Sequence, residues 1–137
     1  MPTRGEDGPT QLLAHDPTDG VYPSTATTYT PMEVRDPQRL LFVAGTMGLD
    51  PGGAPGATLA EQLDLVWSNI RTILGSAGMT VDDIVRLTSY LRDASYAEAN
   101  AAARVKALGG RAVPTTAIVA ETLADAWLVE IEVIAAG

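Results

Sequence analysis

The chain has 137 residues, of which 46% are hydrophobic and 19% charged, and this is the size and composition of one globular domain. Its formal net charge is −8 and its nine lysines and arginines are scattered, so the sequence argues against nucleic acid and anionic membranes as partners. The lack of cysteine excludes disulfides and thiol catalysis, and the single histidine, His15, excludes a histidine-based triad or a multi-histidine metal site.

No apolar run approaches the roughly 20 residues of a membrane-spanning helix, and the first residues lack the apolar segment of a signal peptide. We therefore expect a soluble, cytoplasmic protein.

The N-terminal part of the chain is rich in Pro, Gly, Asp and Thr and has no hydrophobic period. The sequence therefore predicts a flexible arm over residues 1–22 and one domain over residues 23–137. A first strand is expected over residues 27–34, where Pro31 would confine it to a sheet edge or a bulge. The short apolar run over residues 40–44 predicts a buried strand that ends at Gly45.

The clearest helix follows a turn at residues 50–53. Thr58 and Glu61 form a capping-box pattern at its start, and Gly75 and Gly78 predict its end. Its apolar residues lie on one stripe at helical spacing, namely Leu59, Leu63, Val66, Trp67, Ile70, Ile73 and Leu74.

The second half of the chain predicts three more strands and a second helix. Ser95 and Glu98 form another capping-box pattern, which begins an alanine-rich helix that runs to Leu108. The strands are expected over residues 84–91, 116–120 and 127–135, with the short link between the last two predicting a hairpin.

The predicted order is β-β-α-β-α-β-β, an α+β fold. Because each helix lies between strands, right-handed crossovers place both helices on one face of a single mixed sheet. The other sheet face is then uncovered, and a partner subunit is the simplest source of burial for its apolar side chains.

The final strand carries two carboxylates in an apolar run. Glu130 and Glu132 share one face, because side chains two residues apart in a strand point the same way. Trp127, Val129, Ile131 and Val133 line the opposite face, which we expect to pack against the core. Glutamates on a solvated sheet face are the simpler interpretation of this segment alone.

Seven short pieces, in the right order and spacing, resemble the Rid family, also called the YjgF or L-PSP endoribonuclease-like family. The resemblance runs from about Val21 to Gly137. The pieces are Tyr29-Thr30, the strand Leu41 to Thr46, Gln62 with Asn69, Ala77-Gly78, Asp83 to Val85, Tyr96 with Asn100, and Val129 to Ala135.

The resemblance implies a chorismate-mutase-like fold and a homotrimer with clefts between subunits. It also implies hydrolysis of small reactive enamines and imines to a keto acid and ammonia, with no metal or organic cofactor. Carried over by position, Glu130 would be the proton-handling carboxylate, Tyr29 a hydroxyl donor or pocket wall from across the interface, and Asn100 a support of the cleft.

Two departures from the family pattern concern substrate binding. Thr115 takes the place of the family's carboxylate-clamping arginine, and a threonine cannot make the bidentate contact of a guanidinium. Ala44 and Thr46 replace the serine and glutamine of another family motif. If the cleft survives, Thr115 and Thr116 would line it. Arg111 is a candidate substitute for the lost arginine, although a solvated loop arginine is the simpler interpretation.

Three functions follow from this resemblance. The first is a divergent enzyme that acts on an imine, enamine or enol by hydrolytic deamination or tautomerisation. The second is a catalytically silent trimer that binds a small metabolite or a protein partner. The third, ribonuclease activity, is disfavoured by the acidic charge and the missing histidine base. The sequence leaves open whether Arg111, Arg104 or Arg35 of a neighbouring subunit refills the anion site.

Overall fold

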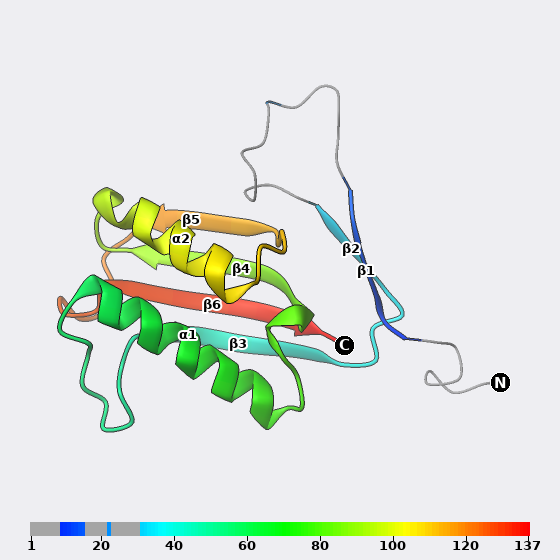
Figure 1. Cartoon of the computed structure of the whole chain (residues 1–137), viewed down its shortest axis with the longest axis horizontal. Coiled ribbons are helices and arrows are strands. Elements are labelled where there is room, and N and C mark those ends of the chain that lie inside the picture. Colours follow the sequence, from blue (N-terminus) through cyan, green and yellow to red (C-terminus); the bar gives the residue numbers. More distant parts are fainter. Residues whose placement is uncertain (1–8, 16–21, 23–30) are drawn as a thin grey trace.

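The computed structural model describes residues 9–15, 22 and 31–137, which form a sheet with two helices and a separate two-stranded sheet (Figure 1). The elements in chain order are β1 (Gln11–Ala14), β2 (Met32–Arg35), β3 (Leu40–Met47), α1 (Leu59–Ser76), β4 (Ile84–Leu91), α2 (Ala97–Ala107), β5 (Thr115–Val119) and β6 (Val129–Ala136), with short 3-10 helices before β4 and α2.

The main sheet is mixed and has the strand order β3-β6-β4-β5. Strand β6 pairs antiparallel with both β3 and β4, whereas β4 and β5 are parallel. Helices α1 and α2 lie together on one face (Figure 1). The α+β architecture with both helices on one face of a mixed sheet is therefore confirmed.

The core lies between the helices and this sheet. Helix α1 buries five of its seven predicted stripe residues, with Leu59 only partly buried and Ile73 exposed. Strand β6 buries Val129, Ile131 and Val133 on the helix-covered face, whereas Trp127 precedes the strand and is half-buried. The alternation of the final strand is thus confirmed, and Glu130 and Glu132 lie on the open face.

The predicted hairpin between the last two strands is wrong. Strand β5 pairs only with β4, in parallel, and β6 lies on the other side of β4, where it separates β4 from β3. The short link therefore crosses over the end of β4 instead of making a tight turn. Link length alone does not distinguish neighbouring strands from strands that have one strand between them.

The prediction of a single sheet also needs correction. Strand β2 does not join the main sheet but pairs antiparallel with β1, which lies inside the predicted arm. Part of the predicted strand at 27–34, up to residue 30, lies outside the described residues. The boundary at residue 22 stays a prediction.

The start of α2 also differs from the predicted capping box. Asp93 accepts a hydrogen bond from the Ser95 amide at the start of the preceding 3-10 helix, and Tyr96 begins α2 without a side-chain cap. Thr58 does cap α1 as predicted, with its hydroxyl accepting from the Glu61 amide. Across the described residues, no helix is long and apolar enough to cross a membrane.

Candidate functional site on the open sheet face

The open face of the main sheet carries polar side chains in two rows that cross β6, β4 and β5. Strand register places Glu130 beside Tyr90, and Tyr90 beside Ile118. The next row contains Glu132, Thr88 and Thr116. Since paired residues share a face, these side chains project together on the side away from the helices.

Glu130 lies against Gly45 at an irregularity in the β3–β6 pairing, where the register shifts between Val43 and Thr46. A Cβ atom on Gly45 would lie 2.2 Å from Glu130 Oε2, closer than atoms can approach. The lack of a side chain at Gly45 therefore makes the room that the Glu130 carboxylate occupies. Bulges of this kind re-aim side chains, and they are common beside active sites.

Glu132 is held by Tyr90, which is not among the site residues expected from the sequence. The Tyr90 hydroxyl donates to Glu132 Oε1 at 2.6 Å. This hydrogen bond, with desolvation and the nearby Glu132 and Glu130 charges, raises the pKa of Tyr90. A raised pKa keeps the phenol protonated, so Tyr90 is a proton-bearing hydroxyl beside two carboxylates.

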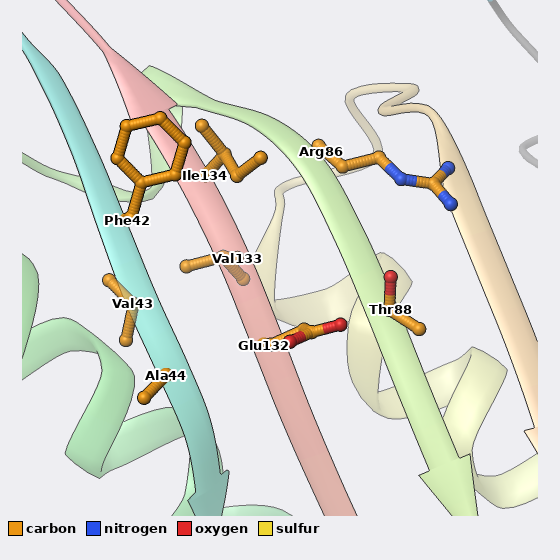
Figure 2. A pocket seen from close by; sticks show the side chains of 8 residues that line it. All are labelled: Phe42, Val43, Ala44, Arg86, Thr88, Glu132, Val133 and Ile134. Atoms are coloured by element: carbon orange, nitrogen blue, oxygen red, sulfur yellow. The ribbon is translucent and has the colours of Figure 1, made fainter.

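Two hollows lie on this face. One, of about 250 Å³, is lined by Tyr90, Glu130 and residues 120–123. The other, of about 430 Å³, is lined by Phe42, Val43, Ala44, Arg86, Thr88, Glu132, Val133 and Ile134 (Figure 2). Tyr90 lines the first hollow and Glu132 lines the second, so the hydrogen bond between these side chains joins the walls of the two hollows.

Two amide side chains of α1, the buried Gln62 and the partly buried Asn69, hold the backbone near Glu130. Gln62 donates to the carbonyls of Gly56 and Ala126 and accepts from the Leu128 amide, two residues before Glu130. Asn69 donates to the carbonyls of Met47 and Leu49, just beyond the irregularity at Gly45. The helix thus holds the end of β3 and the segment that leads into β6.

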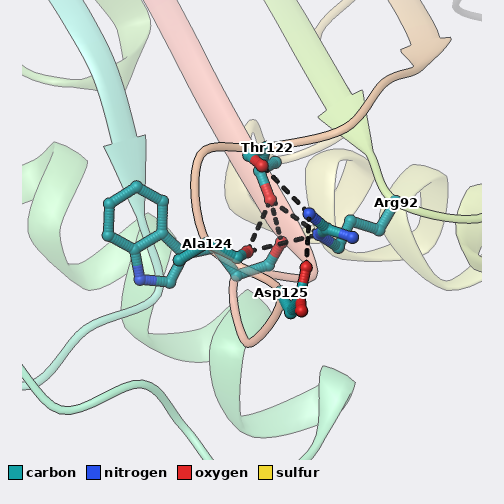
Figure 3. A network of polar contacts seen from close by, with 5 residues as sticks. Arg92, Thr122, Ala124 and Asp125 are labelled. Atoms are coloured by element: carbon teal, nitrogen blue, oxygen red, sulfur yellow. Dashed lines mark hydrogen bonds and ion pairs between the residues drawn. The ribbon is translucent and has the colours of Figure 1, made fainter.

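An arginine network shapes the wall of the smaller hollow (Figure 3). The Arg92 guanidinium, at the end of β4, donates to the Thr122 hydroxyl and carbonyl and to the Ala124 carbonyl, and it pairs with Asp125 at 3.2 Å. Thr122 in turn donates to the Trp127 carbonyl at 2.7 Å. These contacts hold the β5–β6 link over the start of β6.

Among the residues that the structure describes, no three or more His, Cys, Asp or Glu side chains are grouped so that they could hold a metal ion. The open face offers carboxylate, phenol, guanidinium and hydroxyl groups, from Glu130, Glu132, Tyr90, Arg86, Thr88 and Thr116.

A family model described as Endoribonuclease L-PSP matches residues 20–137 of the chain. The chain belongs to this family. The resemblance to Rid proteins is thereby confirmed.

Solved structures of L-PSP relatives agree with this assignment. The chain is 26% identical to the Yersinia pestis protein YyfB of the Rid family, whose function is described as unknown; the match covers 92% of this chain and 98% of that one, with a TM-score of 0.77. It is 33% identical to Rv2704 of Mycobacterium tuberculosis, of the YjgF/YER057c/UK114 family, over 76% of this chain and 83% of that one, with a TM-score of 0.64.

Among curated relatives, the chain is 39% identical to the RutC family protein YjgH of Escherichia coli over 54 residues. The matched segment is 39% of this chain and 41% of the relative, so the chain spans about two fifths of that protein's length.

Of the site residues expected in this L-PSP protein, Glu130 and Thr116 share the open face, and Thr46 lies beside Gly45 with its hydroxyl donating to the Ala44 carbonyl. Tyr29 lies outside the described residues. Thr115 is paired with the buried Leu87, on the helix-covered face, and its hydroxyl donates to the Val113 carbonyl. Within this stretch Thr116, not Thr115, therefore faces the open side.

Two further expected residues are not on the strands of the open face, since Asn100 is on α2 and Arg111 lies between α2 and β5. Asn100 is 1% exposed on α2, and its amide has no hydrogen-bond partner among the described residues. Arg111 is not a solvated loop residue, because it donates to the carbonyls of Val81 and Ile84. Ile84 begins β4, about 20 Å along the strand from the Glu130 row.

Sequence reasoning missed Tyr90 and Arg86. Both are in the strand predicted over residues 84–91, and their spacing of four residues places them on one face with Thr88. The spacing alone does not place these residues near Glu130. That depends on the pairing of β4 with β6, whose register sets Tyr90 opposite Glu130.

Proposed function

We propose that this protein is a Rid-type enzyme that hydrolyses a small reactive imine or enamine to a carbonyl compound and ammonia at clefts between the subunits of a homotrimer. Glu130 acts as the acid and base. Tyr29 is the second catalytic residue carried over from the family. No cofactor is required, and the cytoplasmic location stays a prediction.

One observation carries the proposal: the surrounding backbone leaves a defined position for the Glu130 carboxylate. Gly45 leaves space for Glu130, and the α1 amides hold the end of β3 and the segment that leads into β6. Tyr90 lies opposite Glu130 on β4, with its hydroxyl bonded to Glu132. A carboxylate held beside a hydroxyl donor, on the rim of a small hollow, suits proton transfer to and from a bound water.

The reaction needs two proton transfers. Glu130 takes a proton from a water molecule as the water oxygen bonds to the imine carbon, and it returns that proton to nitrogen, which gives a carbinolamine. Glu130 then moves the proton of the carbinolamine hydroxyl to nitrogen, so the carbon–nitrogen bond breaks and ammonia leaves as the carbonyl forms. An enamine first takes a proton on carbon and loses one from nitrogen, which gives the imine that enters the same sequence. Tautomerisation would use these two proton transfers alone.

The test is ammonia release from 2-imino acids that an amino acid oxidase produces in the assay. Glu130→Gln keeps the shape of the side chain and removes its basicity, so we expect the rate above the uncatalysed background to fall about 100-fold or more. Glu98→Gln, an exposed change on α2, is the matched control and should retain the wild-type rate.

Gly45→Ala provides a second, geometric test, since the added methyl group must displace the Glu130 carboxylate. Equal rates for the wild type and Glu130→Gln would refute the catalytic proposal. If metabolites then raised the melting temperature of both proteins equally, a silent ligand-binding trimer would be the better account.

A further inference from the structure

One arginine on the open face, Arg86, is not among the site residues expected from the sequence. Arg86 lies on β4 and lines the larger hollow with Thr88 and Glu132. Its side chain runs from β4 toward β5, on the side away from Phe42 (Figure 2). There Nη2 donates to the Thr116 hydroxyl at 2.7 Å.

Within the described part of the chain, Arg86 has no carboxylate at ion-pair distance, and the Thr116 hydroxyl is the hydrogen-bond partner that it has. A guanidinium carries five N–H donors, so the described residues leave most of its donors open to a ligand or to solvent. Acidic partners are not scarce, since the chain has 17 acidic and nine basic residues. Glu132, on the same face, is instead bonded by Tyr90.

Several other arginines of the described chain are committed elsewhere. Arg92 and Arg111 bind backbone carbonyls, Arg39 donates to the Ala77 carbonyl, and Arg35 pairs with Glu33 on the separate small sheet. Arg104 is buried on α2, on the helix side of the main sheet. Arg86 thus combines a position beside the hollow with donors directed at no acid.

We propose that Arg86 is the carboxylate-binding residue of this protein, with the Thr116 hydroxyl as the group that positions its guanidinium. The proposal rests on the proposed function, and it names the residue that selects an anionic substrate. The planar fork of the guanidinium matches the two oxygens of a carboxylate.

The spacing of the row suits a small ligand with two different ends. Glu132, Thr88 and Thr116 are on adjacent strands, so Glu132 and Thr116 are about 10 Å apart across the sheet. A carboxylate at Arg86 leaves the nitrogen-bearing end of the ligand toward the glutamates of β6. Phe42 and Ile134 offer apolar contacts to a short side chain in the same hollow.

The test measures the binding of pyruvate to the full chain by NMR titration. Pyruvate is a stable carboxylate shaped like a product of the proposed reaction. We expect Arg86→Gln to weaken pyruvate binding about 10- to 100-fold. Arg86→Lys keeps the charge without the fork and should recover part of the affinity. Thr116→Val should weaken binding severalfold, and Arg71→Gln, an exposed change on α1, should bind as the wild type does.

Pyruvamide, in which a neutral amide replaces the carboxylate, separates charge recognition from general binding. It should bind the wild type and Arg86→Gln with equal, weak affinity. The proposal is overturned if Arg86→Gln and Arg86→Lys both bind pyruvate as the wild type does, if pyruvamide binds the wild type as well as pyruvate does, or if the wild type binds no pyruvate. Circular dichroism verifies that each variant is folded.

The same variants distinguish this proposal from the proposed function. If wild-type protein hydrolyses imino acids and Arg86→Gln leaves KM unchanged, the carboxylate site is wrong and the enzyme activity stands. If pyruvate binding depends on Arg86 while no imine is hydrolysed, the activity is wrong and the site stands. Glu130→Gln should retain pyruvate binding and lose turnover.

Discussion

Individual polar residues on the open face are placed by contacts that a sequence motif does not contain. Gly45 matters because of the atom that it lacks, since its missing Cβ leaves the volume filled by Glu130 Oε2. Tyr90 matters because its hydroxyl reaches across from β4 to Glu132 on β6. Each of these effects depends on two strands that are far apart in the chain.

The Tyr90–Glu132 hydrogen bond makes a prediction about pH. Its formation raises the pKa of Tyr90 above the ordinary value of 10.0, because the neutral phenol is the donor. We expect Glu132→Gln to move the pKa of Tyr90 back toward that value, as measured by phenolate absorbance with Tyr90→Phe as the blank. Unchanged titration in Glu132→Gln would show that the Glu132 carboxylate does not cause the shift.

The sign of the accompanying stability effect follows from the same shift. A group whose pKa is raised by folding stabilises the folded protein fully at pH values below its pKa in the unfolded state. This stabilisation is lost as the pH rises through its pKa in the folded state. The difference in unfolding free energy between wild type and Tyr90→Phe should therefore be constant below about pH 10 and shrink at higher pH.

At the scale of elements, α1 does more than cover the sheet. Its apolar residues bury against β3 and β6, and Gln62 and Asn69 bond the chain at the ends of those strands. Gln62 is 2% exposed, so its bonds to Gly56, Ala126 and Leu128 replace water that cannot reach these groups. The helix thereby couples core packing to the position of Glu130.

Removing the Gln62 amide should be costly. Gln62→Ala leaves the Leu128 amide and two carbonyls without their partner, so we expect the free energy of unfolding to fall by about 1–3 kcal/mol in urea titrations. Asp64→Ala, an exposed change two residues away on α1, is the control and should alter it by less than about 0.5 kcal/mol. Equal effects of both changes would show that Gln62 has no special role.

At the scale of the whole molecule, the open face carries large exposed apolar side chains beside its polar ones. Phe42 is 71% exposed and Ile118 is 46% exposed, on strands β3 and β5 at opposite edges of the main sheet. Apolar side chains distributed in this way favour burial by further copies of the chain. The proposed homotrimer would supply that burial.

The assembly can be tested by mass. Sedimentation of the wild type should give three times the 14.3 kDa chain mass. Phe42→Glu places a charge on the open face and should shift the protein toward monomer and reduce imine hydrolysis with it. Val105→Glu, on the exposed side of α2, should remain trimeric. A wild-type protein with the mass of one chain would contradict the assembly and leave the proposed intersubunit cleft without walls.

The sequence by itself determined the elements of the domain and the family. Local periodicity is enough for α1, for β4 and for the alternation that separates Glu130 and Glu132 from the core, because each repeats over one segment. Tertiary structure alone decided that β6 lies between β3 and β4, that β1 pairs with β2, and that Thr116 rather than Thr115 faces the open side. The same holds for Tyr90 and Arg86, since strand order and register depend on contacts between distant segments that no local pattern encodes.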